Sequence, residues 1–393
     1  MRNKIKKLIP APILKILKEL RYFWIVVLFQ VFHLFPINKR SVVLCNVWGF
    51  GDNAKYVTEE LARRKINIRL IFVTNQPGNA YAPSNVLVVR TNSMKAIYYL
   101  ATARVWLDNN RKESYIRKRK GQYYIQTWHG GIALKKIEKD YEESLGKAYV
   151  KNAKRDSEMT DLYISNSNFC TNLYINSFWY KGEIKEYGSP RNDILLKPDK
   201  GIKNKICKKL NIPVDYKIAI YAPTYREGGE TKAYEMDYNK IIVALTTKFG
   251  GKWVVAVRLH PLVSSLSDFI SYNNKIINAT IYRDVYELMA AGDVLITDYS
   301  NLMFEFSFMR KPVFLYAKDI NEYDKDRGFY FEYKTLPYDR AYHMTELLEN
   351  IQDFEAEEYK SRIETFLNQI DLYEQGNASA LVADHILKVL NNS

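Results

Sequence analysis

Short β-rich apolar runs alternate with amphipathic helical stretches along most of the chain, and this alternation restricts the fold more than any other feature. In the first half the predicted strands span residues 41–47, 68–73, 86–89, 103–107 and 122–128, and the predicted helices span 54–64 and 94–101. Strands separated by helices form parallel sheets, because each crossover needs a helix to return the chain to the same edge. The pattern therefore predicts an α/β protein.

The same alternation begins again after a lysine-rich polar stretch, residues 197–209. Predicted strands follow at 217–222, 253–259, 294–297 and 312–316, with a short one at Ile281, and predicted helices at 238–249, 285–291, 300–309, 345–372 and 378–390. A chain of 393 residues has room for two domains of ordinary size. We predict a basic and apolar segment at 1–38, a Rossmann-like domain at 39–195, and a second one with closing helices at 196–393.

Charge and cysteine content narrow the partners and the compartment. The net charge of +14 favours an anionic partner, which is the phosphates of a small molecule, a nucleic acid or an acidic membrane surface. Its alternative is a basic surface that is merely solvated. The three cysteines are scattered without a CxxC spacing, which argues against a disulfide framework and a structural zinc site. A reducing cytoplasm fits this pattern.

The N-terminal segment has the character of a helix that lies on a membrane surface. Residues 1–21 hold seven basic residues and one acidic residue, Glu19, and an apolar run interrupted by Gln30 and His33 follows at 22–35. A membrane-spanning helix needs about 20 apolar residues, and no cleavage site typical of a secretory signal follows the run. We predict peripheral association with the anionic cytoplasmic face of the cell membrane. The alternative is a core helix with a basic outer face.

Two histidines follow predicted strands directly. His129 stands in Thr-Trp-His-Gly-Gly after the strand at 122–128, and His260 stands in Arg-Leu-His-Pro after the strand at 253–259. Strands of an open α/β sheet bind ligands at their carboxyl ends, and histidine is the side chain best suited to move protons near neutral pH. Both are therefore candidate catalytic residues, although a buried structural histidine would also explain His260.

Hydroxyls, amides and cations follow other strands of the second half. Thr224 and Arg226 come after the strand at 217–222, and the planar guanidinium of arginine suits bidentate phosphate contacts. Ser300 and Asn301 precede an apolar helix and could cap it or attract an anion. A surface ion pair and a plain helix cap are the simpler explanations of these two motifs. Taken together, the motifs predict a cleft that binds a diphosphate and requires no metal.

Several blocks of residues together carry a resemblance to a known family. They lie at 52–56, 103–109, 126–136, 187–193, 222–226, 258–261, 293–301 and 311–314. In their residues and order these blocks resemble the CDP-glycerol glycerophosphotransferases of teichoic acid synthesis and their CDP-ribitol relatives. The resemblance covers about residues 40–335. Its specificity lies in the number and order of the blocks, since each block alone is a weak signal.

The resemblance implies a GT-B-like fold, in which two Rossmann-like domains face a cleft, together with membrane association and no metal or other cofactor. It implies transfer of an alditol phosphate, foremost glycerol phosphate, from CDP-glycerol or CDP-ribitol to a hydroxyl of a lipid-linked saccharide acceptor, with release of CMP. The product would be a teichoic acid or a related cell-wall or capsule polymer.

The resemblance also assigns roles to residues. His129 matches the general base, and His260 matches a second essential histidine on the donor phosphates. Thr224, Arg226, Ser300 and Asn301 match positions that hold the pyrophosphate. We predict that Arg258, beside His260, binds the pyrophosphate as well.

The chain departs from the family pattern at 131–133, at Ser300-Asn301 where a serine pair is usual, and at 336–339, where a Gly-Pro element is expected. Because of these departures, the sequence does not identify the alditol or the acceptor. It also does not determine whether the protein forms a homo-oligomer. A GT-B glycosyltransferase that uses a nucleotide sugar is the enzymatic alternative. A basic membrane-binding or nucleic-acid-binding protein is the other alternative, with Lys118-Arg119-Lys120 in its favour. Because the basic residues are dispersed and no RNA- or DNA-binding signature is present, we predict no nucleic-acid partner.

Overall fold

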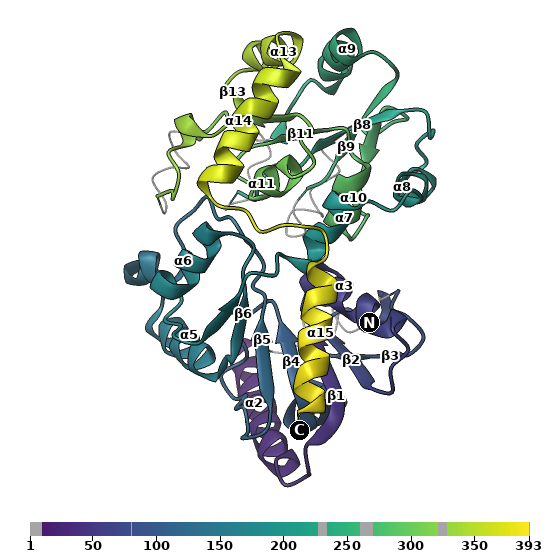
Figure 1. Cartoon of the computed structure of the whole chain (residues 1–393). Helices are drawn as coiled ribbons and strands as arrows, with labels where there is room; N and C mark the ends of the chain where they lie inside the picture. The colour runs from purple at the N-terminus through teal and green to yellow at the C-terminus, as the bar shows by residue number, and fades with distance from the viewer. Residues whose placement is uncertain (1–9, 80, 227–233, 260–269, 321–327, 393) are drawn as a thin grey trace.

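The computed structural model describes residues 10–79, 81–226, 234–259, 270–320 and 328–392 and shows two lobes, each built on a parallel sheet (Figure 1). The first sheet runs in the order β3-β2-β1-β4-β5-β6-β7 and the second in the order β10-β9-β8-β11-β12-β13. In each sheet the chain starts in the middle, builds outward to one edge, and then returns to build the other side. This is the order of doubly wound sheets, and the predicted α/β class with parallel sheets is confirmed.

The first lobe contains the strands β1 (Asn38–Cys45), β2 (Arg69–Thr74), β3 (Val86–Arg90), β4 (Ala103–Asp108), β5 (Tyr123–Gln126), β6 (Leu162–Ile164) and β7 (Glu183–Lys185). Its helices are α2 (Ala11–Phe32), α3 (Asp52–Arg63), α4 (Met94–Thr102), α5 (Lys147–Met159) and α6 (Asn168–Ser177). The central strands are covered on both faces, since Val105, Trp106 and Leu107 of β4 are all fully buried. Strands buried on both faces are continuous apolar runs, which explains why the sequence pattern located them.

The second lobe contains β8 (Lys217–Tyr221), β9 (Trp253–Val257), β10 (Ile276–Asn278), β11 (Val294–Thr297), β12 (Val313–Tyr316) and β13 (Asp339–Ala341). Its helices are α7 (Asp193–Leu196), α8 (Ile202–Leu210), α9 (Tyr238–Phe249), α10 (Val285–Ala291), α11 (Leu302–Ser307), α13 (Met344–Gln352) and α14 (Ala356–Gln369). The division predicted near residue 195 lies between the last strand of the first sheet and the first strand of the second.

Several elements differ from the prediction, and the helices α5, α6 and α8 were not predicted at all. The short strands β6, β7 and β13 were not predicted, because three residues are too few to show a period. The strand placed at Ile281 is Ile276–Asn278, and the Ile281 side chain is exposed. The single helix predicted over 345–372 is two helices, α13 and α14, which are separated at 353–355.

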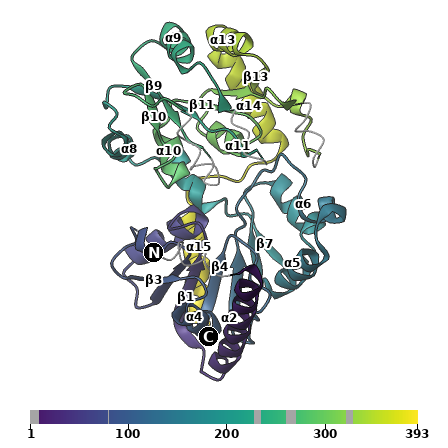
Figure 2. The same cartoon turned by 180° about the vertical axis from the view of Figure 1, so that it is seen from behind.

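The last helix, α15 (Ala378–Asn391), returns to the first lobe, although its sequence position groups it with the second domain. Val382, Ala383 and Ile386 are buried in the same core as Val42 and Leu44 of β1. Seen from opposite sides, Figures 1 and 2 place α15 on one face of the first sheet and α2 with α4 on the other. The segment at 370–377 therefore links the two lobes a second time.

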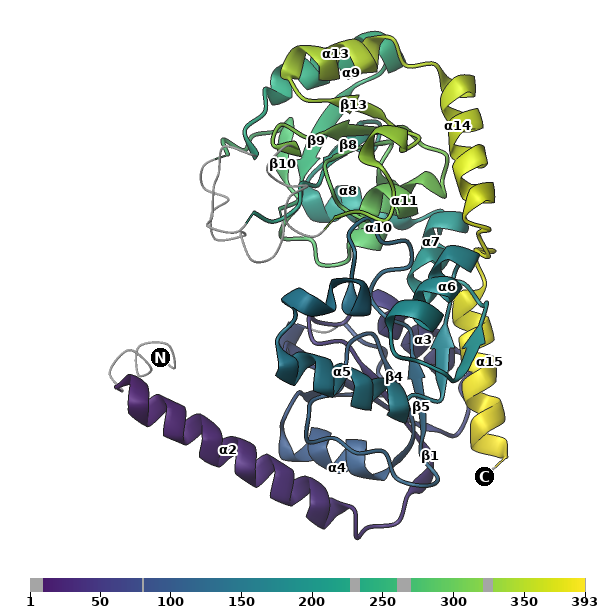
Figure 3. The same ribbon diagram turned by 90° about the vertical axis from the view of Figure 1, so that its left-hand side faces the viewer.

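Helix α2 leans away from the first lobe and is attached to it by its C-terminal half (Figure 3). Ile25 and Phe29 are buried against the core that includes α4, whereas Ile16, Leu20 and Trp24 are exposed. Within the described part of the chain, no helix combines the length and apolarity needed to cross a bilayer. The exposed face of α2 is thus apolar as well as basic.

Candidate active site at the lobe interface

His129 is presented by a tight turn at the carboxyl end of β5. Trp128 has a φ of +52°, in the left-handed region that a bulky residue rarely adopts. Two hydrogen bonds hold this conformation, one from Trp128 N to Gln126 Oε1 (2.9 Å) and one from Asn53 Nδ2 to Trp128 O (3.1 Å). The turn directs the next side chain, His129, beyond the edge of the sheet.

The hydrogen bond that His129 makes fixes its tautomer. Its Nδ1 lies 2.9 Å from the carbonyl oxygen of Asn109, at the end of the neighbouring strand β4. A carbonyl oxygen can only accept, so Nδ1 carries the proton and Nε2 keeps a free lone pair. His129 is exposed at the surface, yet neighbouring protein atoms desolvate its ring, and this desolvation lowers the pKa of His129. Near neutral pH the imidazole is therefore neutral, as a general base must be.

A buried ion pair supports the loop that holds His129. Asp108 Oδ1 accepts hydrogen bonds from the backbone N–H groups of Asn109 (2.8 Å) and Asn110 (2.9 Å), while its Oδ2 pairs with Lys112 Nζ (2.7 Å). These contacts fix the carbonyl group of Asn109. Asp108 and Asn109 belong to one of the blocks that carry the resemblance, but the sequence did not assign them this supporting role.

The two glycines after His129 allow close approaches on both sides of the loop. A Cβ at Gly131 would lie 2.2 Å from Asn166 Nδ2, so no larger residue fits without displacing that buried side chain. A Cβ at Gly130 would lie 3.5 Å from Asn301 Nδ2, and Asn301 Oδ1 accepts a hydrogen bond from Leu134 N (3.1 Å). Asn301 belongs to the second lobe. The structure thus brings the His129 loop and the start of α11 together.

Two buried ion-pair clusters also join the lobes near this loop. Arg191 bonds Asp52 (3.1 Å) from the start of α3 and Glu305 (2.5 Å) from α11. Lys55 Nζ, also on α3, lies 2.6 Å from both Asp284 and Glu287, which belong to α10 of the second lobe. These pairs could not be predicted from the local sequence pattern, because their members lie more than 100 residues apart. Only the occurrence of Arg191, Asp52 and Lys55 in the resemblance blocks pointed to them.

Arg226, which was expected to contact the donor pyrophosphate, binds carboxylates of the protein itself. Its Nη2 bonds Asp298 (2.8 Å), its Nε bonds Asp319 (2.6 Å), and the guanidinium lies over the ring of Tyr299. Thr224 N donates to the same Asp298 carboxylate (2.9 Å). The ends of β8 and β11 are therefore tied together, and the guanidinium is committed to two carboxylates rather than open to a phosphate.

Arg258 differs from Arg226 because it has no carboxylate partner within hydrogen-bonding distance in the described ranges. Its guanidinium donates to the carbonyl oxygens of Ala279 (3.4 Å), Arg283 (3.2 Å) and Tyr282. Burial lowers the pKa of Arg258 to about 10, opposed by the nearby charge of Asp284. Arg258 therefore stays charged at neutral pH, and none of the described residues forms an ion pair with it. His260, two residues later, lies outside the described residues.

Ser300 and Asn301 have different roles at the start of α11. Ser300 Oγ accepts a hydrogen bond from Leu302 N (3.3 Å) in the first turn of α11, whose N-cap position is Asn301. Asn301 makes no capping hydrogen bond, because its side chain reaches across to Leu134. Among the residues that the structure describes, no three His, Cys, Asp or Glu side chains are grouped so that they could hold a metal ion.

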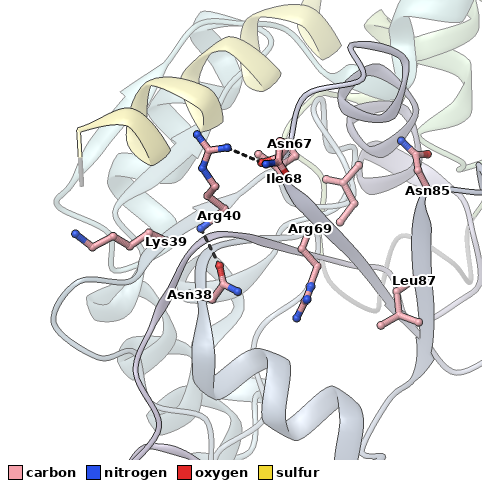
Figure 4. A pocket seen from close by; sticks show the side chains of 9 residues that line it. Asn38, Lys39, Arg40, Asn67, Ile68, Arg69, Asn85 and Leu87 are labelled. Carbon is pink, nitrogen blue, oxygen red and sulfur yellow. Dashed lines mark hydrogen bonds between the residues drawn. The ribbon is translucent and has the colours of Figure 1, made fainter.

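A pocket of about 580 Å³ lies at the opposite, amino-terminal edge of the first sheet (Figure 4). Its lining includes Lys39, Arg40 and Arg69, but their charged ends do not converge. Arg40 bonds the carbonyl oxygen of Asn67 (3.0 Å), and Figure 4 shows Lys39 and Arg69 directed to different sides. Because the strands run from this edge toward His129, the pocket is separate from the candidate active site.

Comparison with known proteins agrees with this geometry. The model of the family described as CDP-glycerol:poly(glycerophosphate) glycerophosphotransferase matches residues 27–388. The chain is 32% identical to the teichoic acid poly(glycerol phosphate) polymerase of Staphylococcus epidermidis over 369 residues, which is 90% of this chain and 51% of that protein. It is 31% identical to the teichoic acid glycerol-phosphate transferase of Staphylococcus aureus over 368 residues, 89% of this chain and 94% of that protein.

A solved structure of a variant of the wall teichoic acid polymerase TagF, soaked with CDPG, superimposes with a TM-score of 0.84 at 28% identity. The superposition covers 100% of this chain and 99% of that chain. The chain spans about half the length of the S. epidermidis polymerase and nearly the whole length of the S. aureus transferase. With a family model that matches most of its length, this chain belongs to the CDP-glycerol:poly(glycerophosphate) glycerophosphotransferase family.

Proposed function

We propose that this protein transfers glycerol phosphate from CDP-glycerol to a hydroxyl of an acceptor in the synthesis of teichoic acid or a related polymer, and releases CMP. The observation that carries this proposal is a neutral His129 with a free Nε2, held where the first lobe meets residues 300–301 of the second. The family and the names of its relatives give the donor and the polymer.

In the proposed reaction, Nε2 of His129 removes the proton of the acceptor hydroxyl. The oxygen attacks the phosphorus that bears glycerol, the bond from this phosphorus to the bridging oxygen breaks, and CMP leaves with the electron pair. Charge grows on the leaving phosphate, so cations and donors must be present there. Arg258 supplies a positive charge that no carboxylate of the described ranges pairs with, and Thr224 and Ser300 supply hydroxyls.

We propose that His260 is a second histidine that contacts the donor phosphates and that Arg226 also contacts the donor pyrophosphate. Because Arg226 is bound to Asp298 and Asp319, it can contact a phosphate only if it exchanges or shares one of these carboxylates. The proposed arrangement is GT-B-like, with the donor on the second lobe and the acceptor on the first. No metal or cofactor is part of this proposal.

We propose further that the acceptor is lipid-linked and that α2 places the enzyme on the cytoplasmic face of the membrane. The support is the exposed side of α2, where Ile16, Leu20 and Trp24 lie beside Lys15 and Lys18. Apolar side chains at an acyl boundary with lysines at the head groups are typical of interfacial helices. CDP-ribitol is the second donor to test, because the departures at 131–133 and 300–301 leave the alditol undecided.

The test is release of CMP from CDP-glycerol, CDP-ribitol and UDP-sugars with lipid-linked acceptors, using the wild type and His129→Ala. Loss of a general base commonly lowers the rate by about a hundredfold to ten-thousandfold. His343→Ser is the matched control, since His343 is exposed on the second lobe and serine keeps its helix cap. Full turnover by His129→Ala would show that His129 is not the general base. Release of UDP in place of CMP would show that the donor is a UDP-sugar and not a CDP-alditol.

A further inference from the structure

We propose that Asn301 is a positioning residue, which fixes the His129 loop across the lobe interface and does not bind the donor pyrophosphate. This inference rests on the proposed function for its kinetic consequence, but its structural part stands on contacts between the lobes. It revises the role that the family resemblance gives to position 301. The residue acts on the reaction through the backbone of the loop that presents the base.

The side chain of Asn301 is already committed to the first lobe. Its Oδ1 accepts the hydrogen bond from Leu134 N at 3.1 Å, between residues 167 positions apart in the sequence. Its Nδ2 faces Gly130, where an added Cβ would come within 3.5 Å. Both ends of the amide are therefore directed at the segment that begins one residue after His129.

Other contacts of the second lobe grip the same segment. The carbonyl oxygen of Leu134 accepts from Tyr330 N (2.7 Å), and Lys136 N donates to the carbonyl oxygen of Gly328 (3.1 Å). Between them, Lys135 and Phe329 form an antiparallel bridge. Asn301 completes this short ladder, because it binds the backbone N–H of Leu134 while Tyr330 binds its carbonyl group. Residues 134–136 belong to the first lobe by sequence but are held by the second.

The opposite side of the loop is blocked. Gly131 packs directly on Asn166, whose side chain is buried, and a Cβ there would lie 2.2 Å from it. The loop is thus confined between Asn166 of the first lobe and Asn301 of the second. Because the donor contacts proposed at 224, 258 and 300 all belong to the second lobe, Asn301 sets the position of His129 relative to the donor.

The side chain of residue 301 must have the reach of asparagine. A serine oxygen is one bond closer to the backbone than Oδ1 and cannot keep the contact with Leu134 N at the same backbone position. Loss of a single hydrogen bond is a modest cost to stability, so the fold should survive. A misplacement of the base by about 1 Å can lower the rate by about a hundredfold.

The test compares Asn301→Ala, Asn301→Ser and Asn301→Asp with the wild type and with Asn239→Ala, an exposed control on α9. Turnover is measured at saturating CDP-glycerol, and donor affinity is measured by calorimetry with CDP-glycerol in a His129→Ala background. We expect Asn301→Ala and Asn301→Ser to lower kcat by about tenfold to a hundredfold, with the donor Kd changed by less than about twofold.

The aspartate variant separates the two roles, since it keeps an acceptor oxygen for Leu134 N but adds a negative charge. If Asn301 positions the loop, kcat of Asn301→Asp should be higher than kcat of Asn301→Ala. A pyrophosphate ligand predicts the reverse, because the charge would repel the donor. The proposal is overturned if Asn301→Ala weakens the donor Kd tenfold with kcat unchanged, or if Asn301→Asp is the least active variant.

Hydrogen exchange supplies a readout that does not need activity. The amide of Leu134 should be protected in the wild type and in Asn301→Asp, and should exchange at least tenfold faster in Asn301→Ala. If the wild type fails to use CDP-glycerol while this exchange pattern holds, the proposed function fails but the contact across the lobes stands. Equal exchange in all variants would refute the positioning role itself.

Discussion

The substitution Glu374→Gln should remove a pH-dependent cost from folding. Glu374 lies in the connection between α14 and α15, where the chain returns to the first lobe. Its Oε1 accepts from Asn192 Nδ2 (2.7 Å) and from Ser189 N (3.0 Å). Burial raises the pKa of Glu374 from 4.5 to about 7, although these hydrogen bonds oppose the increase. The folded state therefore prefers the protonated carboxyl.

The protonation states of Glu374 in the folded and unfolded chain determine how stability changes with pH. Below pH 4.5 the carboxyl is protonated in both the folded and the unfolded chain, and folding carries no cost from it. Between pH 4.5 and about 7 the unfolded chain ionises first, so stability falls as the pH rises. Above pH 7 both states are ionised and the full cost remains. At about 1.4 kcal/mol per pH unit, the interval from 4.5 to about 7 corresponds to about 3 kcal/mol.

The assay is urea unfolding of the wild type and Glu374→Gln at pH 5 and pH 8. Glutamine has the shape of the protonated acid and cannot ionise, so the stability of the variant relative to the wild type should rise by up to about 3 kcal/mol between these pH values. Other titrating groups are common to both proteins and cancel in the difference. Glu349→Gln, on the exposed side of α13, serves as the control. A difference that does not change with pH, or a variant less stable at pH 8, would refute the reasoning.

Four further predictions follow from the same contacts. Because desolvation lowers the pKa of His129, kcat/KM should rise with pH through a midpoint below 6.5, and a midpoint above 7 would contradict a neutral base. In steady-state kinetics, Gly131→Ala should lower kcat at least about tenfold. A second change, Asn166→Ala, should make room for the added Cβ and restore part of kcat. Lys55→Met leaves the buried carboxylate of Asp284 without its ion-pair partner, while Glu287 keeps Lys205, and should cost about 3–5 kcal/mol in urea unfolding, whereas Lys55→Arg should cost less. Dialysis against EDTA should leave CMP release within about twofold of its starting value, and loss of activity restored by a divalent cation would contradict the proposed donor site.

The local pattern of the sequence was sufficient for the long central strands of the two sheets. Apolar runs such as Val42–Cys45 and Val254–Val257 are buried on both faces, and their composition alone identifies them as strands. It was also sufficient to place His129 at the carboxyl end of β5 and to place Ser300 and Asn301 at the start of α11. The ordered blocks of the resemblance indicated the family that the comparisons established.

Only the tertiary structure decided which of these residues meet. The pairs Asn301 with Leu134, Arg191 with Glu305, and Lys55 with Asp284 join positions between 114 and 229 residues apart. Periodicity reports how a segment buries its own side chains, and it carries no information about which distant segment lies opposite. For the same reason, the sequence did not show that α15 returns to the first lobe or that Arg226 binds two carboxylates. Both contacts depend on how distant elements are placed relative to one another, which the pattern of each element does not report.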